Sequence, residues 1–185
     1  MITIGSSTTQ TITANAEQRQ IVIVKAAEQE AEKQRLKEEA EKKERERIRK
    51  EKEEQEKKEK AKKKKLNDLS AQAGRKVVGY TKIKATLSYY TSLASENGGY
   101  ANMTASGVKP KYGCIANNSL KFGTGVYFKG MGTFKVQDRG CSNFNNVYRY
   151  DVYIPRNSGE SDSAYLSRVN NMGKKTVTAY ILEFE

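Results

Sequence analysis

Two aspartates in the second half of the chain, Asp138 and Asp151, are the residues best suited to acid/base chemistry. Residues 133–137 alternate apolar and polar side chains, which predicts a half-buried strand that ends at Asp138. Residues 148–154 alternate in the same way, so Asp151 is predicted within a second strand, where a carboxylate has poor propensity. A loop rich in Gly, Asn and Ser joins the two strands. Two carboxyl groups on strands joined in this way can form an acid/base pair. A turn at Asp138 and a solvated face at Asp151 is the competing interpretation.

Five short motifs follow one another in the second half of the chain. They are Thr104-Ala105-Ser106-Gly107, Gly123-Thr124, QDRG around Asp138, YDVYIP around Asp151, and TVTAYIL near the end. In this order they resemble the signature of the 3D domain, a family named for its aspartates and similar to the lytic transglycosylases of the MltA type. That family is built on a double-psi β-barrel.

The resemblance implies the fold class, while composition divides the chain into a charged first half and a second half that holds almost all of the Tyr, Phe and Gly. Residues 76–185 are expected to form an all-β domain, a six-stranded double-psi β-barrel with a short helix. One long charged α-helix over residues 15–74 precedes it. Residues 1–14 are rich in Thr and Ser and are expected to form an edge strand or to be disordered. They are either an attachment segment for a larger assembly or a frayed terminus.

The family's activity implies cleavage of peptidoglycan glycan strands, with no cofactor and no metal. A lytic transglycosylase needs one acid to protonate the leaving oxygen, and the same carboxyl group then acts as base, because the acceptor is the sugar's own 6-hydroxyl. Asp138 matches the aspartate of the family's D-x-G motif and is expected in this role, which requires it to hold a proton near neutral pH. Asp151 matches the next aspartate and is expected to hold the groove's geometry or to tune Asp138.

The substrate groove is expected to involve residues from several motifs: Tyr90, Thr104, Ser106, Gly107, Thr124, Arg139 and Tyr153. Arg139 is expected to point outward or towards the substrate. The chain departs from the family where many relatives carry a third aspartate and this chain has Asn117 and Asn118. An amide keeps the hydrogen bonds but not the charge. The second hypothesis is therefore a non-catalytic wall-binding or virion structural module on the same barrel.

Charge and residue usage limit the function classes. The formal net charge of +12 favours polyanionic partners, which include nucleic acid, anionic lipid and bacterial wall polymers. The absence of histidine excludes Ser/His and Cys/His nucleophile systems and the usual zinc sites. The two cysteines, Cys114 and Cys141, either form a disulfide or stay small buried apolar residues.

The beginning of the chain lacks the pattern of a secretory signal, and no apolar run approaches the roughly 20 residues of a membrane helix. We therefore expect no membrane span and a protein made in a host cytoplasm that acts at the bacterial wall, as a phage lysis or virion-associated protein does. Its partners are expected to be glycan strands and, through residues 1–14, a phage particle. Nucleic acid binding through residues 62–65 is a third hypothesis, disfavoured because acidic residues are interleaved along most of the helix.

The long helix is predicted with Asn15 as N-cap and Gly74 just beyond its end. Glu residues lie four positions before Lys or Arg along its middle, and each pair stabilises a helix by about 0.2 to 0.5 kcal/mol. Apolar residues are too sparse there for a coiled-coil seam, so an isolated rod is predicted. Residues 21–24 are dense in Ile and Val, so oligomerisation or docking is expected at that end.

In the second half, strands are predicted at residues 77–90, 113–118 and 126–128, and residues 176–184 are expected to close the barrel. Ser161 is expected to cap a short helix ended by Gly173. Leu166, Val169 and Met172 are expected to form its buried face.

Overall fold

The computed structural model describes the backbone of residues 6–185 and the side chains from residue 18 onward. The chain divides into two compact units, Met1–Glu59 and Lys60–Glu185. The elements in order are α1 (Ser6–Ala73), β1 (Val77–Tyr90), β2 (Cys114–Ala116), β3 (Gly125–Phe128), β4 (Gly132–Asp138), a 3-10 turn η1 (Ser142–Phe144), β5 (Arg149–Tyr153), α2 (Asp162–Asn170) and β6 (Lys175–Phe184).

The predicted start of the long helix is wrong, because α1 begins at Ser6 rather than after Asn15. Residues 6–14 are therefore helical, and the edge-strand and disordered alternatives for them are also wrong. A physical reason is that each residue added to an existing helix gains one hydrogen bond without a new nucleation cost. The first five residues of the predicted attachment segment lie outside the described part.

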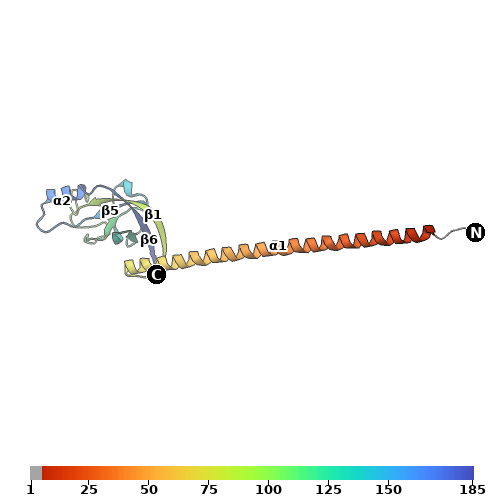
Figure 1. Cartoon of the computed structure of the whole chain (residues 1–185). Helices are drawn as coiled ribbons and strands as arrows, with labels where there is room; N and C mark the ends of the chain where they lie inside the picture. The colour runs from red at the N-terminus through yellow and green to blue at the C-terminus, as the bar shows by residue number, and fades with distance from the viewer. Residues whose placement is uncertain (1–5) are drawn as a thin grey trace, which may run out of the picture. The chain divides into compact units, whose positions relative to one another are not determined.

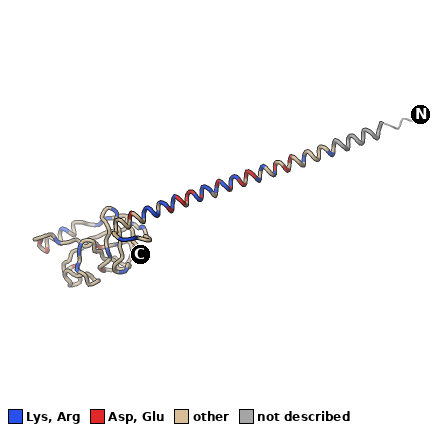
Figure 2. The backbone as a smooth tube through the Cα atoms, turned by 90° about the horizontal axis from the view of Figure 1, so that it is seen from below, with Lys and Arg blue, Asp and Glu red and all other residues tan. Residues whose placement is uncertain are grey.

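From Gln18 to Glu59, every described side chain of α1 is exposed. Ion pairs between residues three or four apart run along this segment, for example Glu39 with Lys43, Glu46 with Lys50 and Glu54 with Lys58. Figure 2 shows acidic and basic positions alternating along it. The sparse apolar residues are exposed as well. Within its own unit, this segment is thus a charged helix whose local ion pairs lie at the predicted spacing.

The last turns of α1 belong to the barrel unit. Leu69 is 1% exposed and packs with Val77, Tyr180 and Leu182. The backbone N–H of Val77 donates to the Ser70 hydroxyl at 2.9 Å. The predicted division at residue 74 is therefore too late, because the helix end contributes its apolar side chains to the barrel's surface.

Six strands close into a barrel in the order β1-β5-β2-β4-β3-β6. The β1–β5 and β2–β4 pairs are parallel and the other four are antiparallel. Figure 1 shows β1 and β6, the longest strands, side by side. The predicted closed six-stranded barrel is confirmed. Its interior is filled by apolar side chains from all six strands, which include Leu87, Ile115, Val126, Phe134, Val152 and Ala179.

Helix α2 confirms one prediction and corrects another. The Ser161 hydroxyl accepts a hydrogen bond from the backbone N–H of Ala164, so Ser161 is the N-cap. The buried face, however, consists of Tyr165 and Val169, while Met172 lies beyond the helix and is exposed. Tyr165 can be buried because its hydroxyl accepts a hydrogen bond from the Ser92 N–H and donates one to the Ile154 carbonyl.

The disulfide alternative is contradicted, since both cysteines are free. Cys114 is buried on β2 and packs with Tyr90 and Tyr153. Cys141 is exposed in the loop that follows β4. Among the described helices, none is both long and apolar enough to span a bilayer.

Candidate active site

Three neighbouring strands bring the two aspartates together. Ala116 on β2 pairs with Asp138 of β4 on one side and with Asp151 of β5 on the other. Adjacent strands lie about 4.8 Å apart, so the two aspartate Cα atoms are separated by about 10 Å. Asp138 ends its strand and Asp151 lies inside its strand, as predicted. A small side chain between them leaves room for both carboxyl groups.

Asp138 is a buried carboxylate, 6% exposed, whose two oxygens both accept hydrogen bonds. The Tyr90 hydroxyl donates to Oδ2 at 2.8 Å. The backbone N–H groups of Ala105 and Arg139 donate to Oδ1 at 2.9 Å and 2.8 Å. Three donors around one carboxyl group match the acceptor-only chemistry of the ionised form. The site therefore holds a fixed negative charge at the end of β4.

Asp151 has a different environment, half-buried and with a single side-chain donor. The Ser88 hydroxyl donates to its Oδ1 at 2.8 Å, from the neighbouring strand β1. The pKa of Asp151 is raised to about 6, chiefly by burial. The negative charges of Glu96 and Asp138 also raise it, and the hydrogen bond from Ser88 lowers it. Asp151 thus keeps its proton up to mildly acidic pH, where an ordinary aspartate has lost it.

A cleft of about 500 Å³ opens beside Asp138. Its walls come from residues 96–98, Tyr100, residues 103–105 and residues 138–141. Asp151 does not line the cleft. The negative charges of Glu96 and Asp138, which both line the cleft, contribute to the raised pKa of Asp151.

The turn over residues 104–107 closes one side of the cleft and is anchored on β4. The Ser106 hydroxyl donates to Oε1 of Gln137 at 2.7 Å, and its backbone N–H donates to the Gln137 carbonyl. The Thr104 hydroxyl donates to the carbonyl of Val108 at 2.9 Å. Gly107 has a φ of +80°, a conformation that favours glycine. The turn positions the Ala105 N–H to donate to Asp138. Of the three binding residues predicted in this turn, Thr104 lines the cleft, and Ser106 and Gly107 do not.

Tyr90 and Tyr153 pair at the ends of β1 and β5 and are both buried. Their rings meet edge to face with centroids 5.7 Å apart. Burial raises the pKa of each phenol above its ordinary value, and for Tyr90 the negative charge of Asp138 adds to the rise. Tyr90 therefore stays a proton donor to Asp138 at all physiological pH values. Neither ring lines the cleft, so the structure places them as supports of the site.

Arg139 lines the cleft with its side chain turned away from the Asp138 carboxylate. Its Nη1 donates to the carbonyl of Asn117 at 2.6 Å, and the guanidinium lies 3.7 Å from the centroid of the Phe122 ring. Thr124 is not brought to this cleft. It is half-buried just before β3, and its neighbours Gly123 and Gly125 line a second cavity.

Asn117, one of the two amides that were compared with a third aspartate, is fully buried. Its Nδ2 donates to the carbonyls of Asn146 and Arg149 at 2.7 Å and 2.9 Å. Its Oδ1 accepts from the N–H groups of Ser119 and Leu120 at 3.0 Å and 2.9 Å. All four bonds of the amide are made, and two of them need the NH₂ group. Asn117 is therefore a structural residue that contributes no charge to the site.

Asn118 orders the loop that leaves Asp138. Its Nδ2 donates to the carbonyls of Gly140 and Cys141, and its Oδ1 accepts from the Gly140 N–H at 2.9 Å. This loop carries Arg139 and Cys141 along the cleft. Asn118 thus shapes the cleft wall without entering it.

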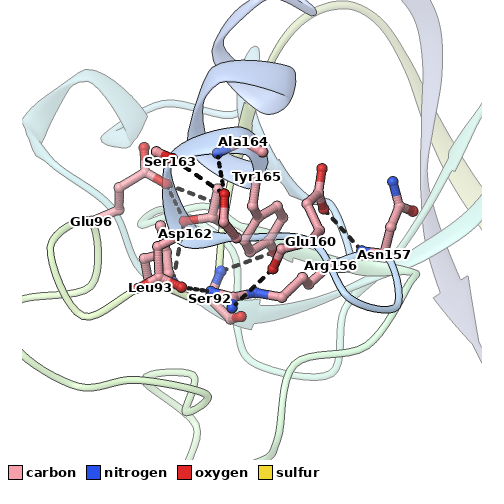
Figure 3. A network of polar contacts seen from close by, with 12 residues as sticks. Ser92, Leu93, Glu96, Arg156, Asn157, Glu160, Asp162, Ser163, Ala164 and Tyr165 are labelled. Carbon is pink, nitrogen blue, oxygen red and sulfur yellow. Dashed lines mark hydrogen bonds and ion pairs between the residues drawn. The ribbon is translucent and has the colours of Figure 1, made fainter.

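Sequence reasoning missed Ser88 and Glu96. Glu96 is the single acidic residue between positions 76 and 137 and lies beside the Asn97-Gly98-Gly99 turn. Its isolation is the signal that could have identified it. Its Oε2 accepts from both the backbone N–H and the hydroxyl of Thr91. Figure 3 shows this loop beside the first turn of α2. There the backbone N–H of Ser92 donates to the Tyr165 hydroxyl, so α2 holds the loop that carries Glu96.

No protein-family model matches this sequence, and no curated protein matches it either. Across the residues that the structure describes, no group of three or more Cys, Asp or Glu side chains is placed to hold a metal ion.

Proposed function

We propose that the barrel domain cleaves the glycan strands of peptidoglycan as a lytic transglycosylase related to the 3D family. One observation carries the proposal. Two aspartates flank Ala116 in contrasting environments, one ionised and held by three donors, the other half-buried with a pKa of about 6. Two carboxyl groups, one that can donate a proton and one that can stabilise positive charge, are the usual machinery of glycosidic bond cleavage.

The geometry favours a division of work opposite to the one expected from the sequence. Asp151 is the better acid because its raised pKa lets it keep a proton at a pH where an ordinary aspartate is already ionised. Asp138 is the better stabiliser of the oxocarbenium-like centre, because its charge is fixed by the Tyr90 hydroxyl and two backbone N–H groups and it faces the cleft.

The reaction then runs in two proton transfers. Asp151 gives its proton to the glycosidic oxygen as the bond to C1 breaks, while the charge of Asp138 stabilises the positive sugar ring. The Asp151 carboxylate next accepts the proton of the sugar's own 6-hydroxyl, whose oxygen forms the new bond to C1. No water is consumed, so the product ends in a 1,6-anhydro ring.

A double-psi topology is part of this proposal. Two parallel strand pairs inside an otherwise antiparallel closed barrel support it, as does the order in which the five sequence motifs occur. A virion-associated lytic protein is the setting we propose, because a charged helix with exposed side chains from Gln18 to Glu59 suits a tether between an attachment point and an enzyme.

The test is digestion of isolated murein by the full chain, followed by mass spectrometry of the released fragments. Anhydro ends are expected; Asp151→Asn should abolish their release, and Asp138→Asn should reduce it strongly. Asp162→Asn is the matched control, because Asp162 is an exposed aspartate on α2 that takes no part in the cleft. Ordinary reducing ends would show hydrolysis instead, and release by Asp151→Asn at the wild-type rate would refute the assignment of the acid.

The second candidate is a wall-binding module that has lost the reaction. Asn117 favours this candidate, because many members of the family carry an aspartate at this place and Asn117 supplies no carboxyl group. Its amide instead makes four hydrogen bonds within the barrel domain. This candidate predicts that wild type and Asp151→Asn sediment with murein equally and that neither releases fragments.

A further inference from the structure

A second cavity, of about 590 Å³, lies in the barrel unit. Its lining comes from the end of α1, from residues 108–114, from the start of β3, from β4 and from Phe184 of β6. Neither Asp138 nor Asp151 lines it. The proposed cleavage makes no use of this cavity.

Four basic residues line this cavity and no acidic residue does: Arg75, Lys109, Lys111 and Lys135. Arg75 is already engaged, since its guanidinium lies 4.9 Å from the Phe184 ring centroid and donates to the backbone oxygen of Glu185. The three lysines are exposed, and none forms an ion pair with any residue that the structure describes. Three like charges around one cavity repel each other, and an anion between them relieves the repulsion.

The cavity also offers a flat apolar surface. The Tyr112 ring is 61% exposed and packs edge to face on Phe134, with centroids 5.5 Å apart. Gly113 and Gly123 have positive φ values, and nothing lies within 4 Å of where a side chain would begin. The backbone is therefore open to a ligand at these two positions of the cavity lining.

We propose that this cavity binds the phosphate groups of a polyol-phosphate chain, a phosphodiester-linked polymer of small polyhydroxy alcohols. Lysine ammonium groups hold phosphate as point charges, and the Tyr112 ring with the open glycine backbone accommodates the carbon chain between phosphates. This site gives the protein an anionic polymer as a ligand in addition to the glycan of the proposed reaction.

The lining favours a polyol chain over single-stranded nucleic acid. Proteins that bind single strands stack successive bases on several aromatic rings. Here Tyr112 is the one well exposed ring among the lining residues, because Phe134 is buried and Phe184 is half-buried under Arg75. One ring and three lysines suit a ligand whose repeating unit is a phosphate rather than a base.

The experiment measures binding of synthetic poly(glycerol phosphate) to the full chain by calorimetry at two salt concentrations. The Lys111→Gln/Lys135→Gln double variant should weaken binding about tenfold or more and reduce its salt dependence. Lys129→Gln is the control, because Lys129 is equally exposed but lies in the turn after β3, outside the cavity. It should bind within about twofold of wild type, since surface substitutions away from a site change little.

Backbone amide shift mapping on the wild-type protein gives a second readout that needs no variant. Perturbations on adding the polymer should gather at Gly113, Gly123 and Gly125, and free inorganic phosphate should give the same pattern at higher concentration. Asp151→Asn should bind the polymer as wild type does, so failure of the cleavage proposal leaves this result intact. Equal weakening by Lys129→Gln and by the double variant, shifts elsewhere, or tighter lysine-dependent binding of oligo(dT) would each overturn the proposal.

Discussion

Replacing Asn117 by aspartate changes one NH₂ group to an oxygen at a fully buried position. The carbonyls of Asn146 and Arg149 then lose their donors, and each unsatisfied buried group costs about 1 to 3 kcal/mol. The two together amount to about 2 to 6 kcal/mol, a large part of the stability of an ordinary domain. We therefore expect Asn117→Asp to lower the free energy of unfolding of the barrel by several kcal/mol.

The loss should depend on pH. Ionising the new carboxyl group would place a charge against two carbonyl oxygens, so its folded pKa must lie above the unfolded value of about 3.9. A group with a raised pKa destabilises the fold as pH rises, so the variant should be worse at pH 8 than at pH 4. Protonation at low pH also restores one of the two donors.

Urea unfolding followed by tyrosine fluorescence is the suitable assay, because the far-ultraviolet signal is dominated by α1. Asn118→Asp is the matched control. Asn118 is only half-buried and its partners lie in an exposed loop, so water replaces the lost donors and the cost should be about 1 kcal/mol or less. An Asn117→Asp protein as stable as wild type at pH 8 would refute the reasoning.

Three further outcomes follow from the structure. Murein cleavage should fall as pH rises through about 6, because Asp151 must be protonated. Asp138→Asn should shift the pH dependence of its residual activity to lower pH, because it removes a negative charge that raises the pKa of Asp151. A flat profile between pH 5 and 8 would contradict this. Alkylation should modify Cys141 in the native protein and block the cleft while sparing buried Cys114, as peptide mapping would verify. A peptide of residues 30–60 should be a helical monomer whose circular dichroism weakens with added salt, and stable dimers in sedimentation would restore a coiled coil.

Local periodicity was enough to predict most strands but could not predict which strands would be neighbours. The alternation in residues 133–137 placed β4 correctly, because β4 buries alternate side chains. The alternation in residues 176–184 placed β6 correctly as well, although β6 also packs its other face against the end of α1. The pairing of Ala116 with both aspartates depends on a closed mixed barrel, which no short window encodes. For the same reason Ser88, far away in sequence, was missed as the partner of Asp151.

Other misses arose where local propensity competed with tertiary contacts. Ser and Thr predict a cap or an irregular segment, yet α1 continues back to Ser6. On α2, Tyr165 was not among the residues expected on the packed face, but its hydroxyl binds the Ile154 carbonyl and the ring is buried. The amide of Asn117 was compared with a missing carboxylate, whereas its four hydrogen bonds explain the residue on structural grounds.

The contrast between the two aspartates originates in where each lies in the barrel. At the end of β4, Asp138 meets backbone N–H groups that no strand partner uses, since the 104–107 turn and the chain leaving the strand both supply one. Inside β5, Asp151 has strands on both sides whose backbone N–H groups form the hydrogen bonds of the sheet. The Ser88 hydroxyl is therefore the one donor to its carboxyl group. The charge settled on Asp138 then raises the pKa of Asp151 further. Two identical side chains are thus divided into a fixed anion and a proton carrier by backbone topology, and exchanging their strand positions would exchange their roles.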